Sequence, residues 1–419
     1  MATLRVWALL GLSATLIACS GDDHPRPAGD EARALPECPD IDTRPCDTHT
    51  PACQARLLAF AGCIYGVDQT PNVPVRVVTE ARLIEELNAE DADAGDETAD
   101  EAADVLHSER ALVDLQLLQP GDLTDEGGST AQIVASIDGV YQDAERGIAL
   151  VDRGKTRSDA NANALLLHEF VHAIQDAEFN LEAWRERHAR STDASLALRT
   201  VPEGQATYAQ FRAYLAMTGR DVARIDWDRT LGNFRDDVIA PAFDAPSRFL
   251  ASITTFPYAY GAANAFRNWP DHQAQFDAPP LTTLQVLSED AGIAFAAPAE
   301  FGEAPTPDAD YRLVDSDTLG AFVFSLSAHG LGAEVSTARG LGQAWRGDQL
   351  YIYAGPAGET VWLWMLQLAD IGYTGELAAL VQTNSRLEAT ASGTRVTLIG
   401  GDTLPQFVTD AGAAFLRAP

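Results

Sequence analysis

The chain is poor in basic residues, in cysteine and in long apolar stretches. It has 29 Lys and Arg against 61 Asp and Glu, a formal net charge of −32, and Lys155 is its only lysine. Such an acidic chain argues against nucleic acid as a partner. No cysteine follows Cys63, so the large C-terminal part must rely on its apolar core rather than on disulfides. No stretch after the first 18 residues is typical of a transmembrane helix.

The first 18 residues are typical of a secretory signal. One arginine precedes an apolar stretch at 6–17, which is too short for a typical spanning helix. Leu16-Ile17-Ala18-Cys19 resembles a bacterial lipobox, whose cysteine is lipidated and becomes the mature N-terminus; the alternative is an ordinary signal peptide. Ser20 resembles a signal for sorting to the outer membrane. We therefore expect an exported protein that is attached to the membrane only by a lipid on Cys19, with residues 19–36 as a tether.

Four cysteines lie within a short segment, residues 37–66. Because the segment is exported, two disulfides are expected, and three pairings are possible. The alternative, a structural zinc site, lacks the usual CxxC pair. The four residues are Cys38, Cys46, Cys53 and Cys63.

The remaining chain is long enough for one large domain or two closely packed ones, and 46% hydrophobic residues suit a substantial core. We divide it into a core at 73–218, which contains an acidic insert at 85–104, and a C-terminal part at 219–419. The alternation of helices and short strands predicts an α+β fold. The core is expected to hold a small sheet, and the C-terminal part to be mainly helical with a late β-hairpin.

Hydrophobic periodicity and capping residues predict the individual elements. Strands are expected at 73–78, 131–136, 147–152, 349–353, 360–368 and 394–399. The second and third are expected to be joined through residues 138–141. Helices are expected at 54–61, 80–88, 158–179, 194–218, 375–383 and 405–416, and over most of 220–330.

The helix at 158–179 carries the sequence His168-Glu169-Phe170-Val171-His172. Residues four apart lie one helical turn apart on one face, so both imidazoles can reach one metal ion. Glu169 lies about 100° round the helix, where it can touch a metal-bound water without being a ligand. This is the HExxH arrangement of two zinc ligands and a general base. The surrounding residues are apolar, and a buried polar cluster of this kind is costly unless it is paired or binds a metal.

A hydrolytic zinc site needs a third protein ligand. The metzincin pattern is excluded, because Gln175 and Glu178 stand where it requires glycine and histidine. The continuing helix suits gluzincins, whose third ligand is a glutamate on a later helix. Glu203 lies 31 residues after His172, far enough for a loop and a returning helix; alternatively it complements a helix dipole. Other candidate ligands are Asp193, Glu178 and His188.

The sequence resembles a pattern, HELVHALQD…EGEAT, of poorly characterised exported proteins of the gluzincin type. The matching segments are His168–Asp176 and Glu203–Thr207. Shorter similarities extend over residues 73–415, to that group's FPYxxG, PPxSTEQVL and WxGDxY segments, at Phe256–Gly261, Pro279–Leu287 and Trp345–Tyr351. The resemblance implies a gluzincin-like zinc-peptidase core with Zn²⁺ bound by His168, His172 and Glu203.

Two positions behind the ligands bear on this resemblance. In thermolysin-like gluzincins the residue four after the ligand glutamate is an aspartate that supports the first histidine, and here it is Thr207. Asp176, four residues after His172, matches an aspartate of the similar group. We expect Asp176 to support the metal ligands from behind.

The resemblance implies a metallopeptidase mechanism. Zinc lowers the pKa of a bound water towards about 7, and Glu169 accepts its proton and passes it to the leaving amine. Tyr258, Tyr260 and His272 are candidate donors to the oxyanion, although both tyrosines also suit simple core packing. Asp348 is expected to be structural. The expected substrate is a peptide or protein, which could pair with a strand edge at 131–152.

Two other functions stay open. The chain could be a surface or periplasmic binding lipoprotein with a structural or degenerate zinc site, as Thr207 suggests. It could also hydrolyse a non-peptide amide, such as a cell-wall bond. Because a structural site needs no base, Glu169 favours the metallopeptidase.

Overall fold

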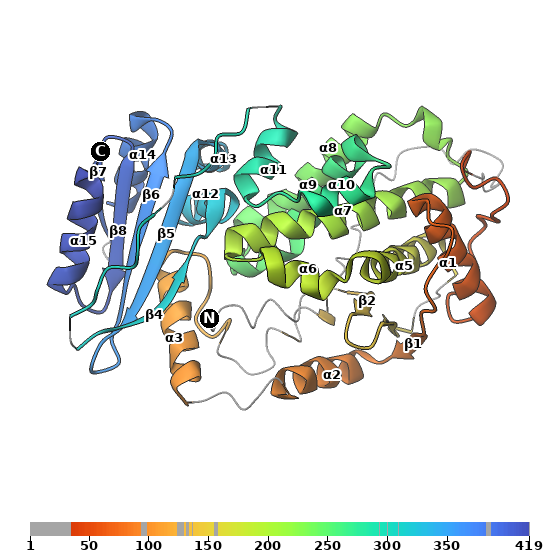
Figure 1. Ribbon diagram of the computed structural model, residues 1–419, viewed down its shortest axis with the longest axis horizontal. Helices are drawn as coiled ribbons and strands as arrows, with labels where there is room; N and C mark the ends of the chain where they lie inside the picture. The colour runs from red at the N-terminus through yellow and green to blue at the C-terminus, as the bar shows by residue number, and fades with distance from the viewer. Residues whose placement is uncertain are drawn as a thin grey trace.

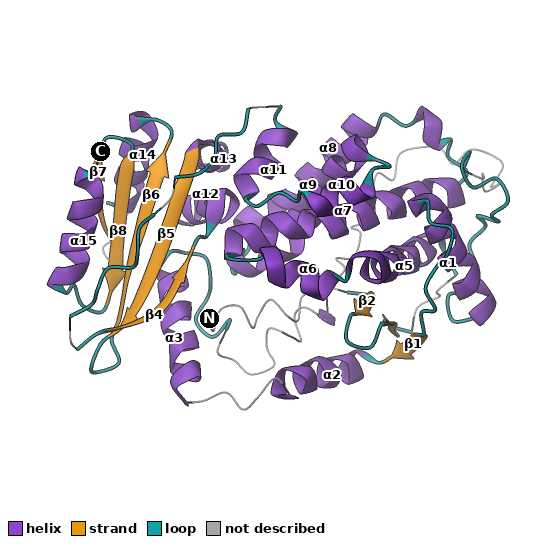
Figure 2. Cartoon of the chain, in the orientation of Figure 1, coloured by secondary structure: helices purple, strands orange, loops and turns teal. Residues whose placement is uncertain are grey.

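The computed structural model describes residues 35–93, 99–123, 130, 134–135, 137–154, 158–292, 294–299, 301–308, 310–382 and 387–418. Most helices gather at one end of the molecule, and the larger sheet lies at the other end with a few helices against it, as Figures 1 and 2 show. The predicted α+β class is confirmed. The signal sequence, Cys19 and most of the tether lie outside the described ranges. Within these ranges no helix is both long and apolar enough to cross a bilayer.

The disulfide-bonded segment is docked on the helical end. Cys38 pairs with Cys63 and Cys46 with Cys53, so both predicted disulfides are present. Helix α1 (Pro51–Tyr65) begins after the Thr50 cap and packs against α5 (Ala160–Phe179). The Asn163 amide on α5 bonds the backbone of Cys46 at both ends, accepting from its N–H at 2.9 Å and donating to its carbonyl at 2.8 Å.

A small mixed sheet lies beside α5. Its strands are β1 (Val75–Val78), β2 (Gly139–Gln142) and β3 (Gly147–Val151), in the order β1-β3-β2. Strand β3 is parallel to β1 and antiparallel to β2. The strand predicted at 131–136 is wrong where it can be checked: residues 134–135 are helical, and 131–133 and 136 lie outside the described residues. Residues 138–141, predicted as the connection, instead contribute most of strand β2. An Asp-Gly pair usually marks a turn, but all four residues of β2 are buried against the core.

The acidic insert is largely helical. Helices α2 (Glu80–Asp93) and α3 (Ala99–Asp114) cover most of it, and residues 94–98 lie outside the described part. Helix α3 packs against the large C-terminal sheet, where the Trp362 indole N–H donates to Asp114 at 3.1 Å. The apolar residues at the C-terminal end of α3, which include Leu112, form its buried face. The acidic composition of the insert gave no indication of this face.

Most of the helical end is formed by α5 and the helices that follow it. Asp159 caps α5 and Ser191 caps α7 (Thr192–Met217), so both helices begin within two residues of the predicted positions. The others are α6 (Leu181–His188), η2 (Val222–Arg224), α8 (Trp227–Asp244), α9 (Arg248–Asn268), α10 (His272–Asp277), α11 (Thr283–Asp290), α12 (Gly320–Gly330) and α13 (Val335–Ala344).

Helices α7 and α9 cross with their backbones in contact. A Cβ atom on Gly204 would lie 2.2 Å from the Gly261 carbonyl oxygen, and one on Gly261 would lie 2.5 Å from the Thr200 carbonyl oxygen. Only glycine fits at such a distance. Because Gly204 directly follows Glu203, the crossing determines the position of that carboxylate.

The C-terminal part contains more helix than strand, as predicted, but its hairpin belongs to a five-stranded antiparallel sheet. The predicted hairpin is its centre, β5 (Trp345–Ala354) with β6 (Thr360–Leu368), and β8 (Arg395–Gly401) also matches a predicted strand. The missed strands are β4 (Arg312–Asp317) and β7 (Leu387–Ser392), which form the two edges in the order β4-β5-β6-β8-β7. Edge strands carry polar, exposed side chains and so lack the apolar alternation of a central strand. Helices α14 (Ile371–Val381) and α15 (Gln406–Arg417) pack on this sheet.

Buried acids join the helical end to the large sheet. Asp193, in the first turn of α7, accepts from the Thr283 N–H at 2.7 Å and from its hydroxyl at 2.5 Å. Asp348 on β5 accepts from the Trp364 indole at 3.0 Å and from the Gly320 N–H at 3.3 Å. Burial is the largest cause that raises the pKa of Asp193, to about 7, and of Asp348. Asp317 accepts from Thr192, and burial raises its pKa to about 6.

Replacing Gly261 with alanine should lower the stability of the protein. The added methyl group would overlap the α7 backbone, and overpacking of this kind costs about 1–3 kcal/mol. Thermal unfolding should show a clear fall in Tm. Gly232→Ala, on α8 with open space around the new methyl group, is the matched control and should not lower Tm. Equal Tm values for the two variants would contradict the backbone contact.

The buried acids should make stability fall as pH rises. Their pKa values are higher in the folded state than the ordinary 3.8, so the folded chain binds more protons and loses stability between about pH 4 and pH 7. Asp348→Asn removes one acid and its repulsion of Asp193, so the fall in Tm between pH 5 and pH 8 should be smaller than in wild type. The exposed control Asp308→Asn should follow the wild-type profile. A D348N profile identical to wild type would refute the assignment.

Candidate metal centre

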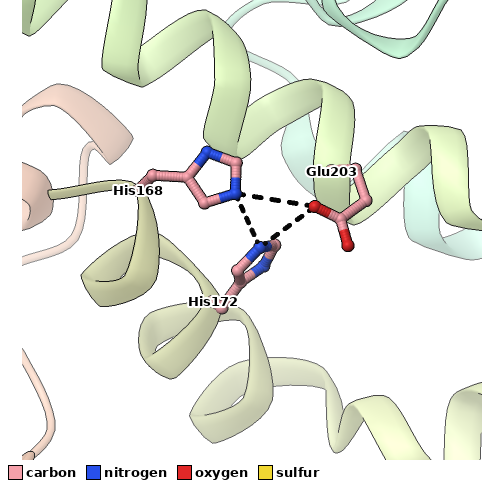
Figure 3. Close-up of side chains that lie close together, drawn as sticks. All are labelled: His168, His172 and Glu203. Atoms are coloured by element: carbon pink, nitrogen blue, oxygen red, sulfur yellow. Dashed lines mark hydrogen bonds and ion pairs between the residues drawn. The ribbon is translucent and has the colours of Figure 1, made fainter. Parts of the chain in front are cut away.

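Two turns of α5 and one turn of α7 bring three metal-ligating atoms together (Figure 3). The Nε2 atoms of His168 and His172 are 3.0 Å apart. The Glu203 Oε2 atom lies 3.5 Å from Nε2 of His168 and 3.3 Å from Nε2 of His172. All three residues are buried: the exposed fraction of the surface is 1% for His168, 6% for His172 and 4% for Glu203. The helices thus meet as the HExxH spacing and the 31-residue separation predict.

These three residues can hold a metal ion. In a tetrahedral site with ligands about 2.0–2.2 Å from the ion, the ligand atoms lie about 3.3 Å from one another. The three observed separations, 3.0–3.5 Å, bracket that value. Three electron-pair donors this close repel one another in a buried site unless a cation lies between them.

Both histidines are oriented by glutamine side chains. The Nδ1 atom of His168 lies 3.0 Å from Oε1 of Gln210, and Nδ1 of His172 lies 2.9 Å from Oε1 of Gln175. The Gln175 amide group cannot be reversed, because its Nε2 donates to the Pro202 carbonyl and to Gln205. The Nδ1 of His172 therefore donates to Gln175, and the Nε2 atoms of both rings face the metal position.

The supporting residues are not the two that the sequence suggests. Asp176 accepts instead from the Tyr141 hydroxyl at 3.0 Å and from the Leu181 N–H at 3.0 Å. Thr207 is buried on α7, and its hydroxyl has no hydrogen-bond partner among the described residues. Gln210 is one turn beyond Thr207 on α7, which is the distance that lets its longer side chain reach His168.

The disulfide-bonded segment takes part in this support. The Tyr65 hydroxyl at the end of α1 donates to Oε1 of Gln205 at 2.6 Å, and Gln205 in turn binds Gln175 at 3.1 Å. Nε2 of Gln205 donates to Gln275 on α10 at 2.7 Å. A chain of side-chain hydrogen bonds therefore runs from the disulfide-bonded segment to the ring of His172.

The charges at the centre favour a cation. Burial alone would raise the pKa of Glu203, but the facing His172, His168 and Arg199 hold it below its ordinary value. Burial alone would lower the pKa of His172, but the carboxylates of Glu203 and Glu169 raise it to about 9. The second carboxylate oxygen of Glu203 lies 3.8 Å from the Arg199 guanidinium, one turn earlier on α7. The site therefore attracts positive charge, as a proton or as a metal ion.

Glu169 lies between this centre and the small sheet. It is completely buried, and its Oε2 accepts from the Tyr141 N–H on β2 at 2.8 Å. Its other oxygen, Oε1, has no hydrogen-bond partner among the described residues. A buried carboxylate oxygen without a donor is costly, and a water or a substrate group at that position would relieve the cost.

Of the candidate oxyanion donors, Tyr258 lies at the centre. Its ring stacks on His168, with centroids 6.2 Å apart, from the adjacent helix α9. Tyr260 packs instead beside Phe256 and Phe322, and the His272 ring stacks on Tyr65.

The alternative ligands lie outside the metal-binding group. Asp193 belongs to the acid cluster at the sheet, Glu178 is exposed, and His188 contacts Trp184 on α6. Sequence reasoning missed Gln175, Gln210 and Arg199. Their signal was helical spacing: Gln210 lies seven residues after Glu203, on the same face, and Arg199 lies four before it.

Comparison with protein-family models, with curated proteins and with solved structures gave no match. The resemblance to exported gluzincins therefore rests on the motifs alone.

Removing the Gln210 amide should weaken metal binding. Gln210→Ala leaves the His168 ring free to rotate, and losses of such supporting groups typically lower metal affinity about 10–100-fold. Gln210→Glu keeps the accepting oxygen and should retain most of the affinity. Competition with a chromogenic zinc chelator measures both, with the exposed Gln382→Ala as the control. Unchanged affinity in Q210A would show that the glutamine does not orient the ligand.

Proposed function

We propose that the chain is an exported zinc-dependent hydrolase of the metallopeptidase type. The observation that carries this proposal is the convergence of two Nε2 atoms and one carboxylate oxygen within 3.5 Å, beside a buried glutamate with an unbound oxygen. Two neutral imidazoles and a carboxylate suit Zn²⁺. The described residues supply three ligands rather than four, which is typical of a catalytic zinc site with one open position.

The reaction assigns a separate task to each residue. Bound zinc would lower the pKa of a water at the open position and polarise a substrate carbonyl. Glu169 accepts the proton of the attacking water at Oε1, the oxygen that no described donor occupies, while the Tyr141 N–H holds Oε2 in place. Glu169 then passes this proton to the leaving amine. Tyr258, stacked on His168, is the candidate donor to the oxyanion.

A peptide or protein is the substrate class that the arrangement suits. Strand β2 is an edge of the small sheet, and it is the strand whose backbone touches Glu169. An extended peptide along this edge would have its carbonyl groups close to the base, but it would have to reach β2 residues that are buried and a Tyr141 N–H that already binds Glu169.

Export and a lipid anchor on Cys19 are part of the proposal. The two disulfides support an oxidising location, because such bonds persist mainly outside the cytoplasm. The signal sequence and Ser20 favour the outer membrane.

One observation favours a binding lipoprotein with structural zinc instead. The ligands and Glu169 are all buried, and a structural site is normally closed. A structural site nevertheless needs four ligands and no base, whereas this centre has three and Glu169. No feature of the described residues favours a non-peptide amide as substrate.

Glu169→Gln separates the two functions. Glutamine keeps the bond from the Tyr141 N–H but cannot accept a proton, so hydrolysis of a peptide library should fall at least about 10²–10⁴-fold. Zinc content, measured by atomic emission, should stay near one ion per chain. Glu178→Gln, on the exposed face of the same helix, is the control and should keep wild-type activity.

Two results would overturn the proposal. Zinc in a wild-type protein that hydrolyses no peptide would support the structural alternative. A wild-type protein that binds no zinc would remove the metal centre itself.

A further inference from the structure

Helix α9 borders a cavity on the side away from the metal centre. Tyr258 stacks on His168, whereas Tyr260, two residues later and therefore on nearly the opposite face of the helix, lines the cavity. The cavity has a volume of about 270 Å³ and lies between α8, α9, α11, α12 and α13. Gly342 and Ser325 also line it.

The cavity contains an arginine, Arg339, that has no acidic partner in the described part of the chain. Arg235 forms ion pairs with Asp290 and Asp236. Arg339 has no hydrogen-bond or ion-pair partner among the described residues, and its Nε atom is buried. The three charged residues of the lining, Arg235, Asp290 and Arg339, therefore leave one net positive charge.

The remaining walls are largely aromatic. Phe243, Tyr260 and Phe322 come from three different helices and line one space. The Arg339 guanidinium lies 5.4 Å from the centre of the Phe243 ring, and that of Arg235 lies 6.0 Å from the Tyr260 ring. Ring faces stabilise the guanidinium groups but satisfy none of their N–H donors.

We propose that this cavity binds a small organic anion, a monocarboxylate attached to an aromatic or apolar body. The planar Arg339 guanidinium offers paired N–H donors that match the two oxygens of a carboxylate. The three rings provide the contact surface for the apolar body. Asp290 in the lining disfavours a doubly charged group such as phosphate, because its carboxylate would repel the second charge.

Phenylacetate is the probe, and its uncharged analogue 2-phenylacetamide has nearly the same shape. Isothermal titration calorimetry on the zinc-loaded protein should give saturable binding of phenylacetate and at least tenfold weaker binding of the amide. Arg339→Gln should lower phenylacetate affinity at least tenfold, with unchanged zinc content. Arg229→Gln, an exposed arginine on α8, should leave it unchanged.

A second variant tests the site without altering charge. Ala291 lies exposed at the edge of the cavity, so Ala291→Phe should block the cavity while the protein stays folded, and phenylacetate binding should be lost. Zinc itself can bind a carboxylate, but that binding would survive both R339Q and A291F.

Three outcomes would overturn the proposal. They are no binding at millimolar phenylacetate, equal binding of the amide, and unchanged affinity in either R339Q or A291F. If R339Q does not fold, A291F decides alone.

Discussion

The contact between the backbones of α7 and α9 determines the geometry of the helical end. Gly204 and Gly261 have no Cβ atoms, and any side chain at either position would overlap the other helix. The contact holds α7 against α9 beside Glu203, and the packing of α7 on α5 brings that carboxylate to the two imidazoles. It also places Tyr258 of α9 over the ring of His168. The contact between Gly204 and Gly261 therefore sets the relative position of two of the three helices that contribute to the site.

Helix α7 carries two buried carboxylates in opposite environments. Glu203 faces two imidazoles and a guanidinium, which hold its pKa low and keep it charged as a cation ligand. Asp193, ten residues earlier, meets a threonine and other acids, and burial raises its pKa to about 7. The neighbours, and not the residue type, decide that the first acts at a metal centre and the second binds Thr283 of α11.

The disulfide-bonded segment is connected to the metal centre by hydrogen bonds. Its Tyr65 is linked through Gln205 and Gln175 to His172, and its Cys46 backbone is held by Asn163 at the start of the same helix. Both sets of hydrogen bonds end on residues of α5, at Asn163 and at His172. The disulfides that hold the segment together are therefore connected to the orientation of a metal ligand.

Several features were predictable from the amino-acid sequence: the helix of His168, Glu169 and His172, the candidacy of Glu203, the two disulfides and the central strands β5, β6 and β8. These features follow from local periodicity, from spacing and from chemistry that few residue types can perform. Strands β4 and β7 escaped prediction because edge strands are polar, and β2 because its Asp-Gly pair is typical of a turn. The support of the histidines by Gln175 and Gln210, rather than by Asp176 and Thr207, became visible only in the packed helices. Helical spacing places Gln210 on the same face as Glu203, but which side chain reaches a histidine ring depends on how α5 and α7 cross.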